Sequence, residues 1–202
     1  MSAGIGKGNR TAYKIIYFIK KRMITHSEEM ESDFRGVIID IETVGDFDNH
    51  YGDSRRCRNI RPVVFGFIDS GSLQIYCAEH PDEIERLIRI ISETLPELER
   101  PLYAFNANFE MSVLFHTLGK EIRFERELNI ERYEGKGVCR LGLGIPNYDD
   151  PFKDNGYECM KAWWAGEFDN VIAHNRSCLL KERDILLKRG YREPDKLRFV
   201  KG

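Results

Sequence analysis

The sequence lacks the marks of a disulfide framework, a zinc cage and a membrane protein. Its five cysteines are an odd number and none has CxxC spacing, so we expect neither disulfides nor a ready-made zinc cage. Unpaired thiols are typical of a reducing compartment, and we expect a cytoplasmic protein. No apolar run reaches the roughly 18–20 residues that span a bilayer, so we expect no membrane partner.

An excess of charge of one sign is also missing. The 31 basic and 33 acidic residues leave a net charge of −2, so any binding of nucleic acid would depend on a local patch. The glycine-rich stretch at 135–144 lacks the GxxxxGK[ST] order of a phosphate-binding loop. What the chain does have is 42% hydrophobic residues over 202 positions, which is enough for one domain with a sizeable core.

The polar and apolar pattern predicts one domain over residues 34–190. Residues 1–33 include the short apolar stretch TAYKIIYFIKKRM, which no small-residue cleavage site follows. We therefore expect a basic N-terminal extension rather than a secretory signal. Residues 191–202 are expected to form a C-terminal tail.

Strand-like and helix-like segments alternate within this domain. We expect an antiparallel meander followed by one further strand, at 36–41, 63–68, 73–77 and 102–105. Helices are predicted at 81–95, up to Gly119, at 157–165 and at 169–188. This order predicts an α/β domain with a mixed sheet, in which ligands bind beyond the carboxyl ends of the strands.

The stretch VIIDIET ends an apolar strand with two carboxylates. Asp40 and Glu42 alternate with Ile41, so they point to the same face of a strand. Neighbouring carboxylates repel unless a cation or proton shares the site, and hard ions such as Mg²⁺ take oxygen ligands of this kind. A solvent-facing strand end is the alternative explanation.

The stretch NANFE follows the fourth predicted strand and opens a helix. Asn106 suits a turn or helix N-cap, and Glu110 suits the first turn of a helix. Together with Asp40 and Glu42, this stretch resembles the DEDD-type 3′–5′ exonucleases of the ribonuclease H-like superfamily. Their D-x-E and N-x-x-F-D motifs are matched here, with Glu110 in place of the usual Asp.

The third motif of that family is only half matched. In one branch it reads like His-Asn-x-x-Asp, and His174 and Asn175 are followed by Cys178 where the Asp would stand. The resemblance covers about residues 34–187. It implies a three-layer ribonuclease H-like fold, with a mixed sheet flanked by helices.

The resemblance also implies a two-metal exonuclease acting on the end of single-stranded DNA or RNA. It assigns Asp40, Glu42 and Glu110 as ligands of Mg²⁺ or Mn²⁺, with two ions expected and one as the alternative. It assigns His174 to the attacking water. The residues expected to contact the substrate are Thr43, Asn106 and, from the basic cluster RRCRNIR, Arg55 and Arg56.

The missing fourth acid leaves two questions open. Glu182 lies one turn beyond Cys178 on the same helix face, about 6 Å further along the axis, and is a further candidate metal ligand. Cys178 suits a small buried residue, and its thiolate would prefer softer ions than Mg²⁺. A nucleic-acid-binding module with impaired chemistry is therefore the alternative function. A structural or interaction domain with residual carboxylates is the third.

Overall fold

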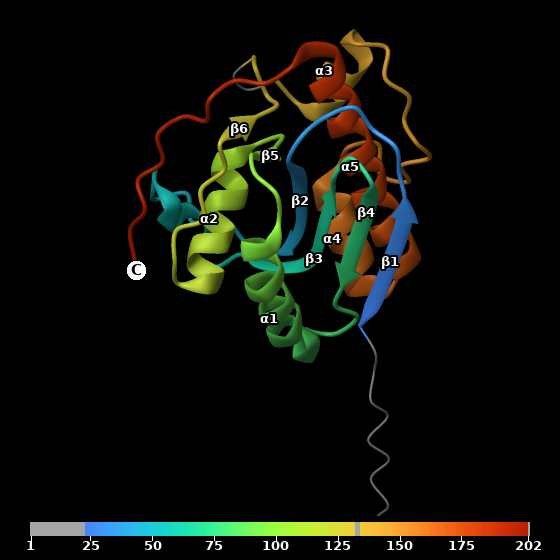
Figure 1. Cartoon of the computed structure of the whole chain (residues 1–202). Helices are drawn as coiled ribbons and strands as arrows, with labels where there is room; N and C mark the ends of the chain where they lie inside the picture. The colour runs from blue at the N-terminus through green and yellow to red at the C-terminus, as the bar shows by residue number, and fades with distance from the viewer. Residues whose placement is uncertain (1–22, 132–133, 202) are drawn as a thin grey trace, which may run out of the picture.

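The computed structural model describes residues 23–131 and 134–201. Its centre is one mixed sheet of six strands in the order β1-β4-β3-β2-β5-β6 (Figure 1). The antiparallel pairs are β1–β4, β4–β3 and β3–β2, whereas β2–β5 and β5–β6 are parallel. The strands are β1 Ile24–Glu29, β2 Val37–Val44, β3 Arg61–Ile68, β4 Ser72–Cys77, β5 Leu102–Ala104 and β6 Arg126–Glu127.

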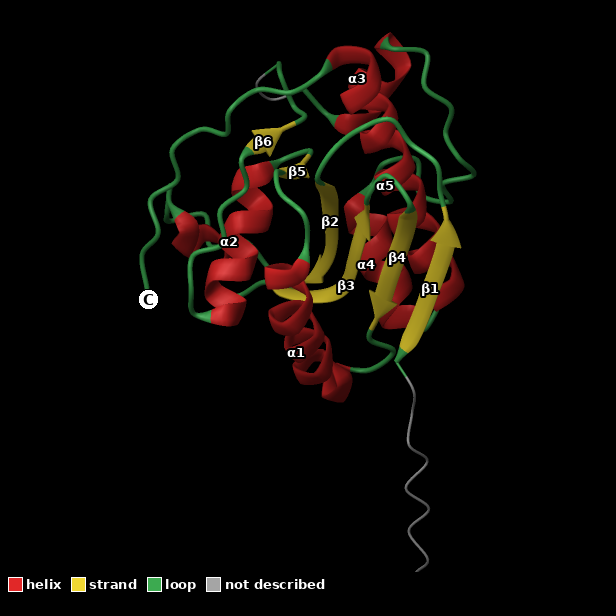
Figure 2. Cartoon of the chain, in the orientation of Figure 1, coloured by secondary structure: helices red, strands yellow, loops and turns green. Residues whose placement is uncertain are grey.

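Helices cover both faces of the sheet, so the α/β prediction is confirmed. In Figure 2, α1 and α2 lie in front of the strands, and α4 and α5 lie behind them. This three-layer arrangement is consistent with a ribonuclease H-like fold. The helices are α1 Ile84–Thr94, α2 Ala107–Leu118, α3 Lys136–Gly142, α4 Gly156–Ala165 and α5 Phe168–Arg189, with short 3₁₀ turns at η1 Ser54–Cys57, η2 Pro81–Glu83 and η3 Leu95–Glu97.

The central strands read as apolar runs because both of their faces are covered. Nearly every residue of β2 and β3 is buried, whereas β4 alternates between buried and half-buried positions. The helix predicted at 81–95 is present as η2, α1 and η3, and α1 buries Ile84, Leu87 and Ile91.

A glycine in β3 brings α5 close to the sheet. A Cβ atom at Gly66 would lie 2.0 Å from Oδ1 of Asn175 and 3.0 Å from a methyl carbon of Leu179. Gly66 is paired with Asp40 across the strands, so this close approach sets α5 directly over the carboxylates of β2. Any larger residue would separate the two.

Both ends of the chain contribute more than the sequence analysis assigned to them. Strand β1 lies within residues 1–33, yet it pairs with β4 along its whole length. Residues of the expected tail also contact the domain: Arg192 bridges to Glu127, and the backbone of Val200 donates to the hydroxyl of Ser54. Except for its last residue, Met23, the apolar stretch of the N-terminal extension lies in residues 1–22, outside the described residues.

The short strand β6 and helix α3 were not predicted, because the apolar pattern of the sequence weakens beyond Lys120.

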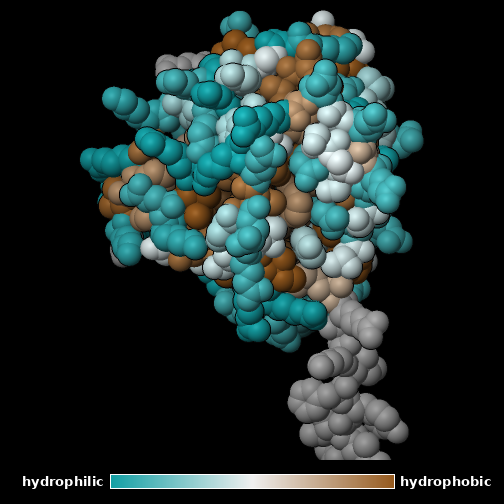
Figure 3. All heavy atoms as spheres, viewed as in Figure 1, coloured by the Kyte–Doolittle hydropathy of each residue, from teal (hydrophilic) through white to brown (hydrophobic). Residues whose placement is uncertain are grey.

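On the face seen in Figure 3, hydrophilic residues predominate and apolar residues show only in separate patches. Among residues 23–131 and 134–201, no helix has both the length and the apolar character that crossing a membrane requires.

Candidate metal centre

A cavity of about 180 Å³ lies beside β2 and the start of α2. The four residues to which the resemblance assigns metal binding or water activation, Asp40, Glu42, Glu110 and His174, line it and come from three elements of the fold. Its lining residues are Asp40, Ile41, Glu42, Phe105, Asn106, Phe109, Glu110, Lys136, Asp154, Gly156, His174 and Cys178.

The carboxylates of this region are almost completely buried. Asp40 and Glu42 share the face of β2 that α5 covers, and their exposed fractions are 7% and 8%. Glu110 enters from the first turn of α2 and is 5% exposed, while Glu182 on α5 is fully buried. We call these four residues the acidic cluster.

Lys136 at the start of α3 lies between two members of the acidic cluster. Its Nζ donates to Oδ1 of Asp40 at 2.9 Å. It also approaches Oε1 of Glu182 at 2.5 Å, an ion-pair distance without hydrogen-bond geometry. Glu182 therefore points toward the site, although it does not line the cavity. Only the tertiary fold brings Lys136 here, and no motif in its glycine-rich stretch indicated it.

Asp40 is held ionised by its neighbours. Burial alone would raise its pKa, but the Lys136 ammonium, the hydrogen bond with Glu182 and the charge of His174 together keep the pKa below its usual value. On the other side, Nδ2 of Asn175 donates to Oδ2 of Asp40 at 2.8 Å. The Asn of the expected third motif thus positions the Asp of the first.

The other three carboxylates of the acidic cluster are poorly compensated. Burial raises the pKa of Glu42 to about 7, with the charge of His174 opposing the shift. Burial, together with the charges of Asp40 and Glu182, raises the pKa of Glu110 well above its usual value. Burial does the same for Glu182 despite the Lys136 ammonium. Without a further cation, these side chains retain protons in order to stay buried.

His174 connects the acidic cluster to a second set of charges. Its Nε2 lies 3.6 Å from Oε1 of Glu42, and its Nδ1 lies 2.7 Å from Oδ1 of Asp150. Burial lowers the pKa of His174, but Cys178, Glu42 and the hydrogen bond with Asp150 together raise it above its usual value.

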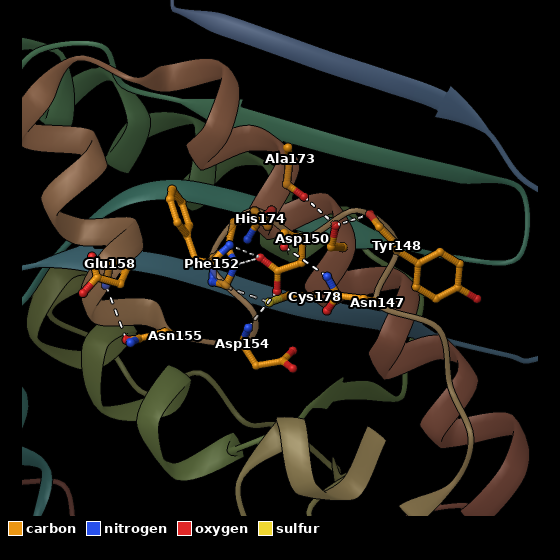
Figure 4. Close-up of polar contacts among 12 residues, drawn as sticks. Asn147, Tyr148, Asp150, Phe152, Asp154, Asn155, Glu158, Ala173, His174 and Cys178 are labelled. Carbon is orange, nitrogen blue, oxygen red and sulfur yellow. Dashed lines mark hydrogen bonds and ion pairs between the residues drawn. The ribbon is translucent and has the colours of Figure 1, made fainter. Parts of the chain in front are cut away.

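Asp150 belongs to a group in which acids and bases are matched. Nζ of the fully buried Lys181 lies 2.6 Å from Asp150 and 2.7 Å from Asp154, and Arg140 pairs with the other oxygen of Asp154. We call Asp150, Asp154, Lys181 and Arg140 the balanced cluster. Figure 4 shows Asp150 between His174 and the loop that carries Asp154.

Two groups of side chains in this region could hold metal ions. One comprises Asp40, Glu42 and Cys178, and the other Glu42, Cys159 and His174, with the ligand atoms of each group within 4.8 Å of one another. Oε2 of Glu110 is buried without a hydrogen-bond partner among the described residues. An orphaned oxygen and an excess of buried carboxylates both suit a divalent cation, so the residues present fit a metal. Cys159 on α4 stands in no motif, and sequence reasoning missed it.

Of the residues expected to contact a substrate, Asn106 lines the cavity and the other three do not. Asn106 is exposed, lines the cavity and makes no N-cap hydrogen bond with its side chain. Thr43 follows an irregularity in the pairing of β2 with β3, and it is not a cavity residue. Arg55 is paired with Asp53, and the guanidinium of Arg56 lies 4.8 Å above the ring of Phe47. Both arginines are outside the cavity lining.

The fold and these side chains define an α/β protein with a buried group of carboxylates, thiols and an imidazole that could bind a metal. No family model, curated protein sequence or solved structure matched the chain.

Proposed function

We propose that the protein is a metal-dependent exonuclease that hydrolyses phosphodiester bonds at the 3′ end of single-stranded DNA or RNA. The observation that carries this proposal is the convergence of Asp40, Glu42, Glu110 and His174 on one cavity. These side chains come from β2, α2 and α5, and they match the positions that the resemblance assigns to the chemistry.

Asp40, Glu42 and Glu110 would hold Mg²⁺ or Mn²⁺, with Glu182 behind them. A divalent ion bound there would activate water and neutralise charge on the leaving oxygen. His174 presents Nε2 to the cavity while Asp150 fixes its ring, as suits a residue that orients water or takes its proton. The Lys136 ammonium would offset phosphate charge beside Asp40.

A route for the nucleic-acid strand leads away from the cavity. The ring of Phe109 lines the cavity and lies 6.0 Å from the ring of Phe47, which is 46% exposed. The guanidinium of Arg56 also lies over the ring of Phe47. Aromatic rings beside an arginine suit the stacking of bases and the binding of the phosphate backbone.

The experiment is a cleavage assay on end-labelled single-stranded DNA and RNA with Mg²⁺ or Mn²⁺. We expect stepwise shortening from the 3′ end by the wild type, and activity reduced to background in Asp40→Asn. Asp169→Asn, which removes an exposed carboxylate at the start of α5, is the matched control and should retain full activity. A wild type that cleaves neither substrate with either ion would overturn the proposal.

The second candidate is a module that binds nucleic acid without turning it over. The ammonium of Lys136 lies between Asp40 and Glu182, where it supplies positive charge that a second ion would otherwise bring. Cys178 also stands in place of an acid. This candidate predicts strand binding by the wild type without cleavage, and cleavage gained in Cys178→Asp. Strand binding is followed by fluorescence anisotropy.

A further inference from the structure

The cysteines of the site are its least expected members. Magnesium sites are built from oxygen ligands, and thiols contribute little to them. Cys159 on α4 and Cys178 on α5 are 1% and 3% exposed, and each belongs to one of the two groups of potential ligands that share Glu42. Cys159 is grouped with an imidazole, that of His174, whereas Cys178 is grouped with a second carboxylate, that of Asp40.

We propose that Glu42, Cys159, Cys178 and His174 form a site for one borderline transition-metal ion of the Zn²⁺ class. The inference deepens the proposed function, on which its catalytic meaning rests. It replaces the direct role of His174 toward water with a role as a metal ligand, and the bound ion would then activate the water. The oxygen ligands Asp40, Glu110 and Glu182 lie outside this set.

The distances around Nε2 of His174 suit tetrahedral coordination. Ligands bound at about 2.0–2.3 Å around a tetrahedral Zn²⁺ are about 3.3–3.8 Å apart. Nε2 lies 3.6 Å from Oε1 of Glu42 and 3.8 Å from Sγ of Cys178. The ligand atoms of Glu42, Cys159 and His174 all lie within 4.8 Å of one another, and Cys178 approaches this group through Nε2 of His174.

The other ring nitrogen of His174 has the partner that a metal-binding histidine requires. Metal-ligating histidines usually donate their second N–H to a carboxylate, which fixes the ring and its tautomer. Nδ1 of His174 lies 2.7 Å from Oδ1 of Asp150, and Figure 4 shows the ring between Asp150 and Cys178. Asp150 itself accepts from Lys181 and from the backbone N–H groups of Phe152 and Asp154. Nε2 is thereby directed at Glu42 and the sulfurs.

The donor set separates this ion from Mg²⁺. Thiolate and imidazole ligands favour Zn²⁺, Co²⁺ and related ions, and binding displaces the thiol protons. A site with two sulfurs, one nitrogen and one carboxylate would therefore discriminate strongly against Mg²⁺. Glu42 borders both this site and the carboxylates around Lys136, so it would connect the two.

The test is a titration of the full-length, metal-free protein with Co²⁺, followed by absorption spectroscopy. We expect one Co²⁺ per chain with a sulfur-to-cobalt charge-transfer band in the near ultraviolet. Stoichiometric Zn²⁺ should displace the ion, and a large excess of Mg²⁺ should not. If the wild type shows no sulfur band, or if Mg²⁺ displaces the Co²⁺, the inference is overturned without any variant.

Variants locate the sulfur ligands. Cys159→Ala and Cys178→Ala should each weaken or remove the band, whereas Cys139→Ala, a buried cysteine on α3, should leave it unchanged. Circular dichroism of each variant establishes that it is folded. An unchanged band in folded Cys159→Ala and Cys178→Ala would contradict the assignment. Because the readout is binding, a sulfur band without nuclease activity would refute only the proposed function.

Discussion

Two buried charged clusters adjoin His174, and they differ in how far their carboxylates are paired with cationic side chains. The balanced cluster matches Asp150 and Asp154 with Lys181 and Arg140 at short distances. The acidic cluster sets four carboxylates against Lys136 and the imidazole. Buried charges are tolerated when they are paired, so the balanced cluster is complete in itself. The acidic cluster remains short of positive charge, which is the condition expected of a cation site.

The balanced cluster should be the most sensitive to substitution. Lys181→Met leaves the carboxylates of Asp150 and Asp154 without their shared ammonium, and we expect a loss of about 3–5 kcal/mol in the free energy of unfolding. Urea denaturation measures it. The control is Lys161→Met on α4, where the pair with Glu158 is exposed and no measurable change is expected. Equal losses in both variants would remove the distinction between buried and exposed pairs.

The close packing of α5 against Gly66 should be less sensitive to substitution than the balanced cluster. Gly66→Ala places a methyl group against Oδ1 of Asn175, and overpacking of this kind costs about 1–3 kcal/mol. Gly71→Ala is the control, because the nearest atom to its added methyl would be 3.7 Å away. Denaturation of both variants gives the difference. A fully stable Gly66→Ala would show that α5 does not need this contact.

Removing an acid from the acidic cluster should stabilise the protein, in contrast to the two substitutions above. Burial raises the pKa of Glu110 in the folded protein above its usual value of 4.5. As pH rises past 4.5, the unfolded state therefore releases a proton from Glu110 that the folded state still binds. Stability of the metal-free protein therefore falls with increasing pH above that value. Glu110→Gln should remove part of this slope and raise stability at pH 7 by on the order of 1 kcal/mol.

Denaturation of metal-free wild type and Glu110→Gln at several pH values checks this sign. The contrary outcome is a variant that is less stable than the wild type at pH 7. That result would mean that Glu110 is compensated within the folded protein, as the members of the balanced cluster are.

The smallest effect is expected at the edge of the sheet. Arg176 on α5 pairs with Glu28 on β1 and lowers its pKa. The pair contributes above the unfolded pKa of Glu28, and the contribution is lost as pH falls through the lowered pKa. Arg176→Met should cost up to about 1 kcal/mol at pH 7, and Arg35→Met, whose pair with Glu99 is far more exposed, nothing measurable. Identical melting curves for all three proteins would assign no role to the Glu28 pair.

The sequence predicted the elements whose pattern is local. Four of the six strands and four of the five helices in residues 23–131 and 134–201 were located, because apolar runs, alternation and apolar stripes are properties of neighbouring residues. Strand β1 was missed because its sequence, ITHSEE, has one apolar residue, lies on a half-exposed edge and follows a basic stretch. Strand β6 has two residues and α3 has seven, too few for a period to show.

The residues of the site likewise fall into those that the sequence indicated and those that only the fold reveals. Asp40, Glu42, Asn106, Glu110, His174 and Asn175 stand in short motifs, so their order along the chain indicated them. Lys136, Asp150 and Cys159 have no such context, and they meet the motif residues only through tertiary contacts. The balance of charge in the cavity depends on these residues, so it could not be predicted before the fold.

The most direct test of the account is whether a divalent ion stabilises the folded protein through the acidic cluster. The measurement is the free energy of unfolding in urea with chelator and with Mn²⁺, for the wild type and for Glu42→Gln. At a free ion concentration of 100 times its Kd, the wild type should gain about 2.7 kcal/mol, and Glu42→Gln should gain little. Equal stability of the wild type with and without Mn²⁺, or an equal gain in the variant, would contradict the account.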